Sequence, residues 1–181
     1  MSEPSDDVAT VVAAWAGGDF VLPSAGTTDV LLCRACSRLG SGRLGLSVER
    51  LQDDGSVLSE LICSEEHEGG PGVAHGGWVA GILDELVGHV PLLNGQLAVT
   101  GTLEVRFVKP VPINEPLVGR ATLTSREGTR WMVQADLTLA RSGALLATGS
   151  GTLVERDPAH FARHRAWLQS QSTPSIDAPA L

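Results

Sequence analysis

A single apolar helix among extended segments is the feature of this sequence that most restricts its fold. From Gly77 to about Leu93, apolar residues recur with the 3.6-residue period of a helix, and Pro91 near the end of the run suggests termination. The segments on both sides alternate apolar and polar residues, as strands do. Because several strands have to bury one helix, we expect a sheet that curls around it.

The expected strands are separated by short turn signals. Residues 44–51 and 57–63 flank Asp53-Asp54-Gly55, which predicts a hairpin. A longer strand covers residues 99–107 and ends at Lys109-Pro110-Val111-Pro112. Three further strands, joined by glycine-containing connections that favour antiparallel hairpins, are expected at 116–126, 129–140 and 144–155.

The resulting order, β-β-α-β-β-β-β, predicts an α+β domain in which a curved antiparallel sheet of about six strands wraps one long central helix. A doubly wound parallel sheet is disfavoured because helices and strands do not alternate. We place this domain at residues 43–156. It follows an N-terminal extension (1–42) with a short helix and an irregular C-x-x-C segment, and it precedes a charged C-terminal helix with a flexible tail (157–181).

The charge balance restricts the partners. The formal net charge is −8, whereas nucleic-acid-binding proteins usually carry a basic footprint, so we expect no nucleic-acid partner. No apolar run reaches the ~20 residues of a membrane helix, and the acidic start does not resemble a signal peptide. We therefore expect no membrane partner and a cytoplasmic location.

The sequence contains three cysteines, Cys33, Cys36 and Cys63. The first two have the C-x-x-C spacing of half a zinc site, but a second half is missing from the sequence. A redox site would place the pair in a strand-to-helix turn, which this segment does not resemble. We expect reduced thiols with no metal and no cofactor, and keep zinc or redox chemistry as the alternative.

One face of the helix combines small residues with a carboxylate. The large apolar side chains form one stripe, and the opposite face holds Gly77, Ala80, Gly81, Asp84 and Gly88. Each glycine destabilises a helix by up to ~1 kcal/mol relative to alanine, so three on one face suggest close approach of another backbone or a ligand. Asp84 is then a functional carboxylate, and the alternative is that it is only solvated.

The helix opens with His75-Gly76-Gly77. Free N–H groups there favour negative charge, and glycine lets a carbonyl oxygen come close, which is the geometry of an oxyanion hole. Gly76 and Asp84 are ~12 Å apart along a helix, so one carbonyl group cannot contact both in the same chain. If both act on one substrate, Asp84 comes from a second subunit with an antiparallel helix, which predicts an obligate dimer.

The segment H-G-G-W-V-A-G-I-L-D (75–84), followed by Val99-Thr100 and L-E-V-R-F-V-K-P-V-P (103–112), resembles the PaaI-like acyl-CoA thioesterases of the hotdog superfamily. The resemblance covers about residues 43–156. It implies the hotdog fold and hydrolysis of an acyl-CoA or acyl carrier thioester by homodimers, which commonly form tetramers. Coenzyme A is then part of the substrate and not a cofactor.

The resemblance also implies a role for each matching residue. Gly76, followed by Gly77, would donate its N–H to the thioester oxygen. Asp84 would act as general base on water or as nucleophile. Thr100 would hydrogen-bond the water or the carboxylate, and His75 would orient the loop or the thioester.

Some positions leave alternatives open. Related thioesterases often carry Asn or Gln where this chain has Gly69, and His67 either substitutes for that amide or is only solvated. Glu85 is expected to be a flanking residue, because it points ~100° away from Asp84 on the helix. The strand parity of Thr100 opposes that of the apolar residues after it, unless a bulge intervenes.

The phosphates of coenzyme A require cations at the rim of the cleft. The candidates are the only lysine and three arginines, namely Lys109, Arg106, Arg126 and Arg130. Trp78 and Trp131 are either walls of the acyl tunnel or core residues.

Two other functions fit the same fold. A non-catalytic acyl-CoA binder or sensor would need an output module, and no DNA-contacting segment is visible. An enoyl-CoA hydratase or dehydratase would need an Asp/His pair on one substrate, whereas His75 leads directly into two glycines.

Overall fold

The computed structural model describes residues 44, 46–157 and 159–171. Six strands form one antiparallel sheet in the order β1-β2-β6-β7-β8-β5. Their bounds are β1 Leu46–Leu51, β2 Val57–Ile62, β5 Ala98–Phe107, β6 Pro116–Glu127, β7 Arg130–Leu139 and β8 Ala144–Glu155. The predicted strands and their antiparallel pairing are confirmed, whereas Cys33, Cys36 and the predicted tail lie outside the described residues.

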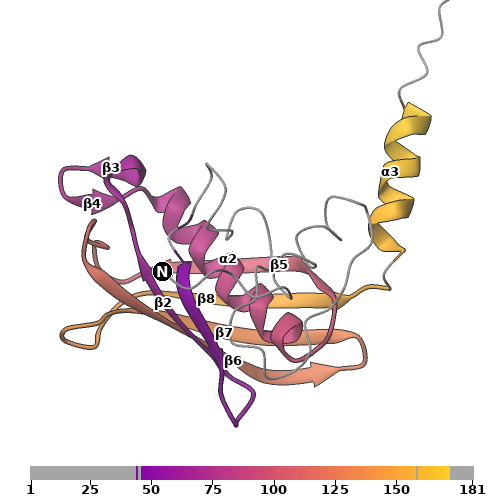
Figure 1. The fold of residues 1–181 in the computed structure, drawn as a ribbon, viewed down its shortest axis with the longest axis horizontal. Coiled ribbons are helices and arrows are strands. Elements are labelled where there is room, and N and C mark those ends of the chain that lie inside the picture. Colours follow the sequence, from indigo (N-terminus) through magenta and orange to yellow (C-terminus); the bar gives the residue numbers. More distant parts are fainter. Residues whose placement is uncertain (1–43, 45, 158, 172–181) are drawn as a thin grey trace, which may run out of the picture.

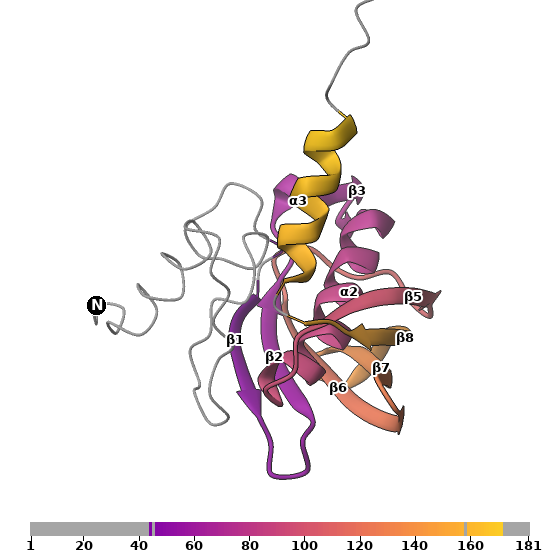
Figure 2. The same cartoon turned by 90° about the vertical axis from the view of Figure 1, so that its right-hand side faces the viewer.

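The chain between β2 and β5 forms the long helix and a small two-stranded sheet. A 3-10 turn, η1 (Glu65–His67), leads into β3 (Glu68–Gly70) and β4 (Val73–Ala74), and α2 (Gly76–Leu93) follows. Figures 1 and 2 show the six-stranded sheet curving around α2, with β1 and β2 on one side of the helix and β5 on the other. The predicted wrapping of one helix by the sheet is confirmed.

Glycines on the concave face of the sheet let α2 come close to it. A Cβ atom added to Gly119 of β6 would lie 2.6 Å from a methyl group of Leu86, too close for any real contact. One added to Gly151 of β8 would lie 3.0 Å from Cγ2 of Val87. Large helix side chains therefore occupy the space that sheet side chains would otherwise fill, which packs the core to the density of protein interiors.

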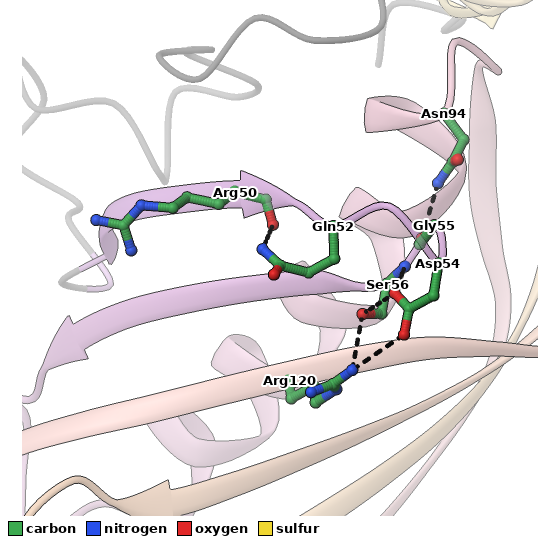
Figure 3. Close-up of polar contacts among 7 residues, drawn as sticks. All are labelled: Arg50, Gln52, Asp54, Gly55, Ser56, Asn94 and Arg120. Carbon is green, nitrogen blue, oxygen red and sulfur yellow. Dashed lines mark hydrogen bonds and ion pairs between the residues drawn. The ribbon is translucent and has the colours of Figure 1, made fainter.

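The turn between β1 and β2 is tied to both the helix and the sheet. The side-chain amide of Asn94, which caps α2, donates to the carbonyl oxygen of Gly55 (3.1 Å). Asp54 accepts hydrogen bonds from the N–H and hydroxyl of Ser56, which lower the pKa of its carboxyl, and it also pairs with Arg120 of β6. Figure 3 shows these contacts converging on the turn, so the predicted hairpin end is fixed on two sides.

The C-terminal helix α3 (His160–Gln171) has no buried residue, and Figure 2 shows it projecting away from the sheet. The predicted charged helix at this position is confirmed. None of the helices in the described part of the chain has both the length and the apolarity needed to cross a membrane.

Candidate active site

His75 caps the N-terminus of α2 with its own side chain. Its ring atom Nδ1 accepts a hydrogen bond from the N–H of Gly77 (2.9 Å), and its backbone is extended. The N–H of His75 in turn donates to the carbonyl oxygen of His67 (2.7 Å). Because Nδ1 is used as an acceptor, the neutral ring carries its proton on Nε2, and that N–H is available to a ligand.

Gly76 is the first residue of α2, and its N–H has no hydrogen-bond acceptor among the described residues. The N–H of Gly77 is already taken by His75. Of the two glycines expected at the oxyanion site, only Gly76 therefore presents a free donor. Its neighbour is Phe107 at the end of β5, since a Cβ atom on Gly76 would lie 3.6 Å from Cζ of the Phe107 ring.

Asp84 lies in the middle of α2. One of its carboxylate oxygens, Oδ1, is buried and has no hydrogen-bond partner among the described residues. An unpaired buried carboxylate oxygen is costly, so a group outside these residues has to satisfy it when the site is complete. α2 is continuous from Gly76 to Asp84, which places the free N–H and this carboxylate ~12 Å apart in one chain.

Thr100 faces the helix because β5 contains a bulge. The pairing of β5 with β8 shifts between Thr100 and Thr102, so that Gly101 has no cross-strand partner. Thr100 pairs with Leu153, which is fully buried, and Leu103 pairs with Gly151. Because of the bulge, Thr100 and Leu103 therefore point to the same face of the sheet. The bulge that the parity argument required is present, and Thr100 lies on the same side of the sheet as α2.

The glycines on the small-residue face of α2 have neighbours within their own chain. An added Cβ atom would meet the His75 ring at Gly77, Leu44 at Gly81 and Leu153 at Gly88. At Gly81 and Gly88 these distances, 3.7 and 4.0 Å, are ordinary contacts, so the interpretation that the glycines mark the approach of another backbone or a ligand stays a prediction. The capping imidazole and the segment before β1 supply the neighbouring atoms, which a helical wheel cannot show.

The four candidate cations lie at opposite ends of the sheet. Arg106 pairs with Thr148 of β8, whereas Arg130 pairs with Val154, six residues or ~20 Å further along the strand. Arg126, next to Arg130, is already ion-paired with Glu155 and lies 4.7 Å from the centre of the Trp131 ring. The structure therefore does not bring the four side chains together within one chain.

The positions left open by the sequence also have definite surroundings. Trp78 and Trp131 are each 4% exposed, so both are core residues of this chain and not walls of an open tunnel. A Cβ atom on Gly69 would lie 2.6 Å from Cα of His75, which leaves no room for the amide side chain of related thioesterases. The ring of His67 lies 6.3 Å from that of Trp78 beside the helix start.

The sequence did not predict a buried charged cluster around His89. Its ring is 2.7 Å from a carboxylate oxygen of Glu49 on β1 and 3.0 Å from one of Glu85, a turn earlier on α2. Ser59 of β2 donates to Glu49 (3.0 Å). Burial disfavours the charged ring, but the two carboxylates outweigh it and raise the pKa of His89 to about 10. The i,i+4 spacing of Glu85 and His89 was the only signal for this cluster.

Comparison with known proteins finds a family that this fold resembles. Residues 71–143, which run from the β3–β4 turn to the β7–β8 turn, match the thioesterase superfamily. Among the solved structures of similar fold are PaaI of Escherichia coli (16% identity, 61% of this chain and 83% of that one, TM-score 0.56) and a thioesterase-like protein of Streptococcus pneumoniae bound to coenzyme A (20%, 61% and 87%, TM-score 0.56). The predicted hotdog fold is confirmed.

Curated relatives are similar over about half of the chain. Human acyl-coenzyme A thioesterase 13 is 28% identical over 100 residues, which cover 54% of this chain and 71% of that protein. Mouse acyl-coenzyme A thioesterase THEM4 is 28% identical over 91 residues, 50% of this chain and 39% of that protein. The chain therefore spans less than half the length of the mouse relative that it matches.

Proposed function

We propose that this chain hydrolyses an acyl-CoA thioester to a free acid and coenzyme A, with Asp84 as its key carboxylate. The observation that carries the proposal is the buried oxygen Oδ1 of Asp84, which has no partner among the described residues. Asp84 lies in the region that matches the thioesterase superfamily, which suggests that the carboxylate takes part in thioester hydrolysis. The names of the human and mouse relatives suggest that the substrates are acyl-CoA esters.

In this mechanism the thioester oxygen accepts a hydrogen bond from the free N–H of Gly76 at the positive end of α2. Asp84 takes a proton from water, whose oxygen attacks the carbonyl carbon, or attacks the carbon itself to give an anhydride that water then opens. In the first route the carbon–sulfur bond then breaks, and the leaving thiolate takes up the proton that Asp84 removed from water. In the second route this bond breaks as the anhydride forms, and the water that opens the anhydride supplies the proton for the thiolate. Thr100, on the same face as α2, hydrogen-bonds the water or the carboxylate.

Two solved variants of the Streptococcus pneumoniae protein support this pairing of residues. One replaces an aspartate with alanine and the other replaces a threonine sixteen positions later. Asp84 and Thr100 have the same spacing. The shared spacing makes Thr100 the hydroxyl residue that accompanies Asp84 in our proposal.

The site is completed by a second copy of the chain. Gly76 and Asp84 are fixed ~12 Å apart on one helix, so the carboxylate that serves a given Gly76 belongs to another subunit. We place the contact between the two copies at β5, because it is an edge strand of the sheet and carries Thr100. A homodimer with two equivalent sites follows, and pairing into a tetramer and a cytoplasmic location remain predictions.

The decisive experiment measures thiol release from a panel of acyl-CoA esters. Asp84→Ala should fold as the unaltered protein does and lose hydrolysis by about 100-fold or more, and Asp84→Asn should lose somewhat less. Asp136→Asn on the outer side of β7 is the matched control, since it removes an exposed carboxylate of the same type. Retained turnover in Asp84→Ala would contradict the proposal, as would absence of hydrolysis in the unaltered protein.

A hydratase or dehydratase is less well supported. Its histidine would have to accept a proton, but Nδ1 of His75 is occupied by the N–H of Gly77 and Nε2 carries the proton. Hydration of an enoyl-CoA by the unaltered protein would reverse this ranking. A non-catalytic binder would instead show tight acyl-CoA binding by calorimetry without thiol release.

A further inference from the structure

The helix α3 presents an aromatic face to solvent. Trp167 is 56% exposed, Leu168 is 46% exposed and Phe161 is 39% exposed. At ~100° per residue, these three side chains share one face of ~120° with His160 and His164. The His164 ring stacks on that of Trp167, with 5.6 Å between the ring centres. Exposed aromatic side chains gathered on one face are typical of a protein–protein contact surface.

α3 is also a basic segment of an acidic chain. The formal net charge of the chain is −8, yet residues 160–171 contain two arginines and no acidic residue. On the helical wheel, Arg163 and Arg165 flank the aromatic face on its two sides. Arg163 is ion-paired with Asp157 just before the helix (2.8 Å), whereas Arg165 makes no ion pair with any described residue. A partner that covers this face should therefore offer acidic groups at its rim.

The complementary charge lies just before α2. Glu65 and Glu66 open the turn η1, are exposed and make no ion pair with the described part of the chain. The carbonyl oxygen of His67, the last residue of η1, accepts a hydrogen bond from the N–H of His75 (2.7 Å). This bond holds η1 beside the start of α2, so two negative charges that no described cation balances border the helix start.

Exposed apolar side chains complete this part of the surface where β5 ends. Phe107 is 59% exposed and Val108 is 43% exposed. The Phe107 ring lies against Gly76, the first residue of α2. We call the surface formed by Phe107, Val108, Glu65 and Glu66 the α2 corner. Its apolar side chains with carboxylates beside them match an aromatic helix face with arginines beside it.

Within one chain, α3 and the α2 corner lie at opposite ends of β5. β5 runs from Ala98, which pairs with Glu155, to Phe107, nine residues or ~30 Å further along. The N–H of Arg156 donates to the carbonyl oxygen of Leu97 (2.9 Å), so the chain continues to α3 from beside the start of β5. Figure 1 shows α3 on the right and β3, which follows η1, on the left, both on the side of the sheet that carries α2.

In the proposed dimer, the two-fold axis brings these opposite ends together. The axis has to place Asp84 of one copy beside Gly76 of the partner subunit, so the two α2 helices run antiparallel on the same side of the joined sheets. The two β5 edges then also run antiparallel, and the start of β5 in one copy lies beside the end of β5 in the other. α3 of each copy therefore lies next to the α2 corner of its partner.

We propose that α3 of each copy packs on the α2 corner of the partner subunit. Its aromatic face covers Phe107 and Val108 of the partner subunit, and Arg165 pairs with Glu65 or Glu66 of the partner subunit. The inference rests on the proposed dimer with sites shared across β5, and it adds a contact from outside the sheet. Each copy then contributes α3 as well as Asp84 to the surroundings of the partner's Gly76.

Sedimentation of charge variants tests this contact. Arg165→Glu should raise the dissociation constant of the dimer about tenfold or more, because like charges then face each other at both contacts. The double variant Glu65→Arg with Glu66→Arg should do the same, and Trp167→Ala should weaken the dimer through lost apolar contact. Arg50→Glu on β1, at the opposite edge of the sheet from β5, is the matched control and should leave the dissociation constant unchanged.

Mixing the two charge variants tests whether the contact joins different chains. In a heterodimer of Arg165→Glu with the double variant Glu65→Arg and Glu66→Arg, one contact has its charges exchanged and the other is native, so both are attractive. In either homodimer both contacts are repulsive. After subunit exchange, native mass spectrometry should therefore find heterodimer well above its statistical share. The unaltered protein mixed with an isotopically labelled copy should give the statistical share.

The outcomes separate this contact from the proposed site. Statistical mixing with unchanged dissociation constants in the charge variants would overturn the contact and leave the dimer standing. Statistical mixing together with binding to phosphatidylglycerol vesicles that Trp167→Ala abolishes would assign the aromatic face to an anionic membrane surface instead. An unaltered protein that stays monomeric at every concentration would contradict the shared site itself. None of these measurements uses turnover, so they hold whether or not the protein hydrolyses acyl-CoA.

Discussion

Raising the pH should destabilise this protein through a single buried histidine. Glu49 and Glu85 raise the pKa of His89 to about 10, against an ordinary value of 6.5, although burial alone would lower it. A histidine with a raised pKa stabilises the fold fully below its unfolded pKa, and this stabilisation is lost as the pH rises toward the folded pKa. The free energy of unfolding should therefore fall between pH 6.5 and 10.

The size of the effect follows from one proton. Between pH 7 and 9 the folded protein keeps a proton that the unfolded chain has released, so the free energy of unfolding should fall by about 1.4 kcal/mol per pH unit. Urea denaturation at a fixed protein concentration would measure this slope. The upper limit is set at pH 9 because burial raises the pKa of the Cys63 thiol to about 11, and its release on unfolding would add to the slope above that value.

The matched variant removes both carboxylates. In the double variant Glu49→Gln with Glu85→Gln, burial alone acts on His89 and its pKa should fall below the ordinary value. The decline in stability between pH 7 and 9 should then disappear. A flat profile in the unaltered protein would refute the assignment of a charged His89, and an unchanged slope in the double variant would refute its cause.

Three substitutions at glycines test other parts of the structure. Gly119→Ala should destabilise the fold by about 1–3 kcal/mol, because its Cβ atom would lie 2.6 Å from Leu86, whereas Gly88→Ala, with its nearest neighbour at 4.0 Å, should be neutral or stabilising in thermal unfolding. Gly101→Ala brings a Cβ atom within 3.2 Å of the carbonyl oxygen of Thr152 and should disturb the bulge. We expect Gly101→Ala and Thr100→Val each to lower kcat for acyl-CoA about tenfold. Equal activity of Gly101→Ala and the unaltered protein would show that the bulge is not needed.

Local patterns predicted the elements of the fold well. The helix from Gly76 to Leu93 and the six strands follow from periodicity and turn signals, since each of these depends on residues close in sequence. The helix continues two residues past Pro91, although proline has no N–H to donate to the carbonyl oxygen four residues earlier. The free N–H of Gly76 and the place of Asp84 on the same helix were also accessible from the sequence.

The features that the sequence did not reveal depend on contacts between distant segments. The cluster of Glu49 and His89 joins β1 to α2 across forty positions, and nothing in the local pattern links the two. The neighbours of Gly81 and Gly88 within the chain could not be predicted for the same reason, since Leu44 and Leu153 lie outside the helix. The face of the sheet to which Thr100 points became clear only from the register of β5 against β8.

The close fit of α2 to the sheet has a consequence for how this sequence can diverge. Gly119 faces Leu86 and Gly151 faces Val87, and in each pair one partner has no side chain so that the other can be large. A larger side chain in the sheet can be accommodated only if the facing helix residue is replaced by a smaller one at the same time. We therefore expect these positions to vary in compensating pairs, with the combined volume of each pair conserved better than either residue alone.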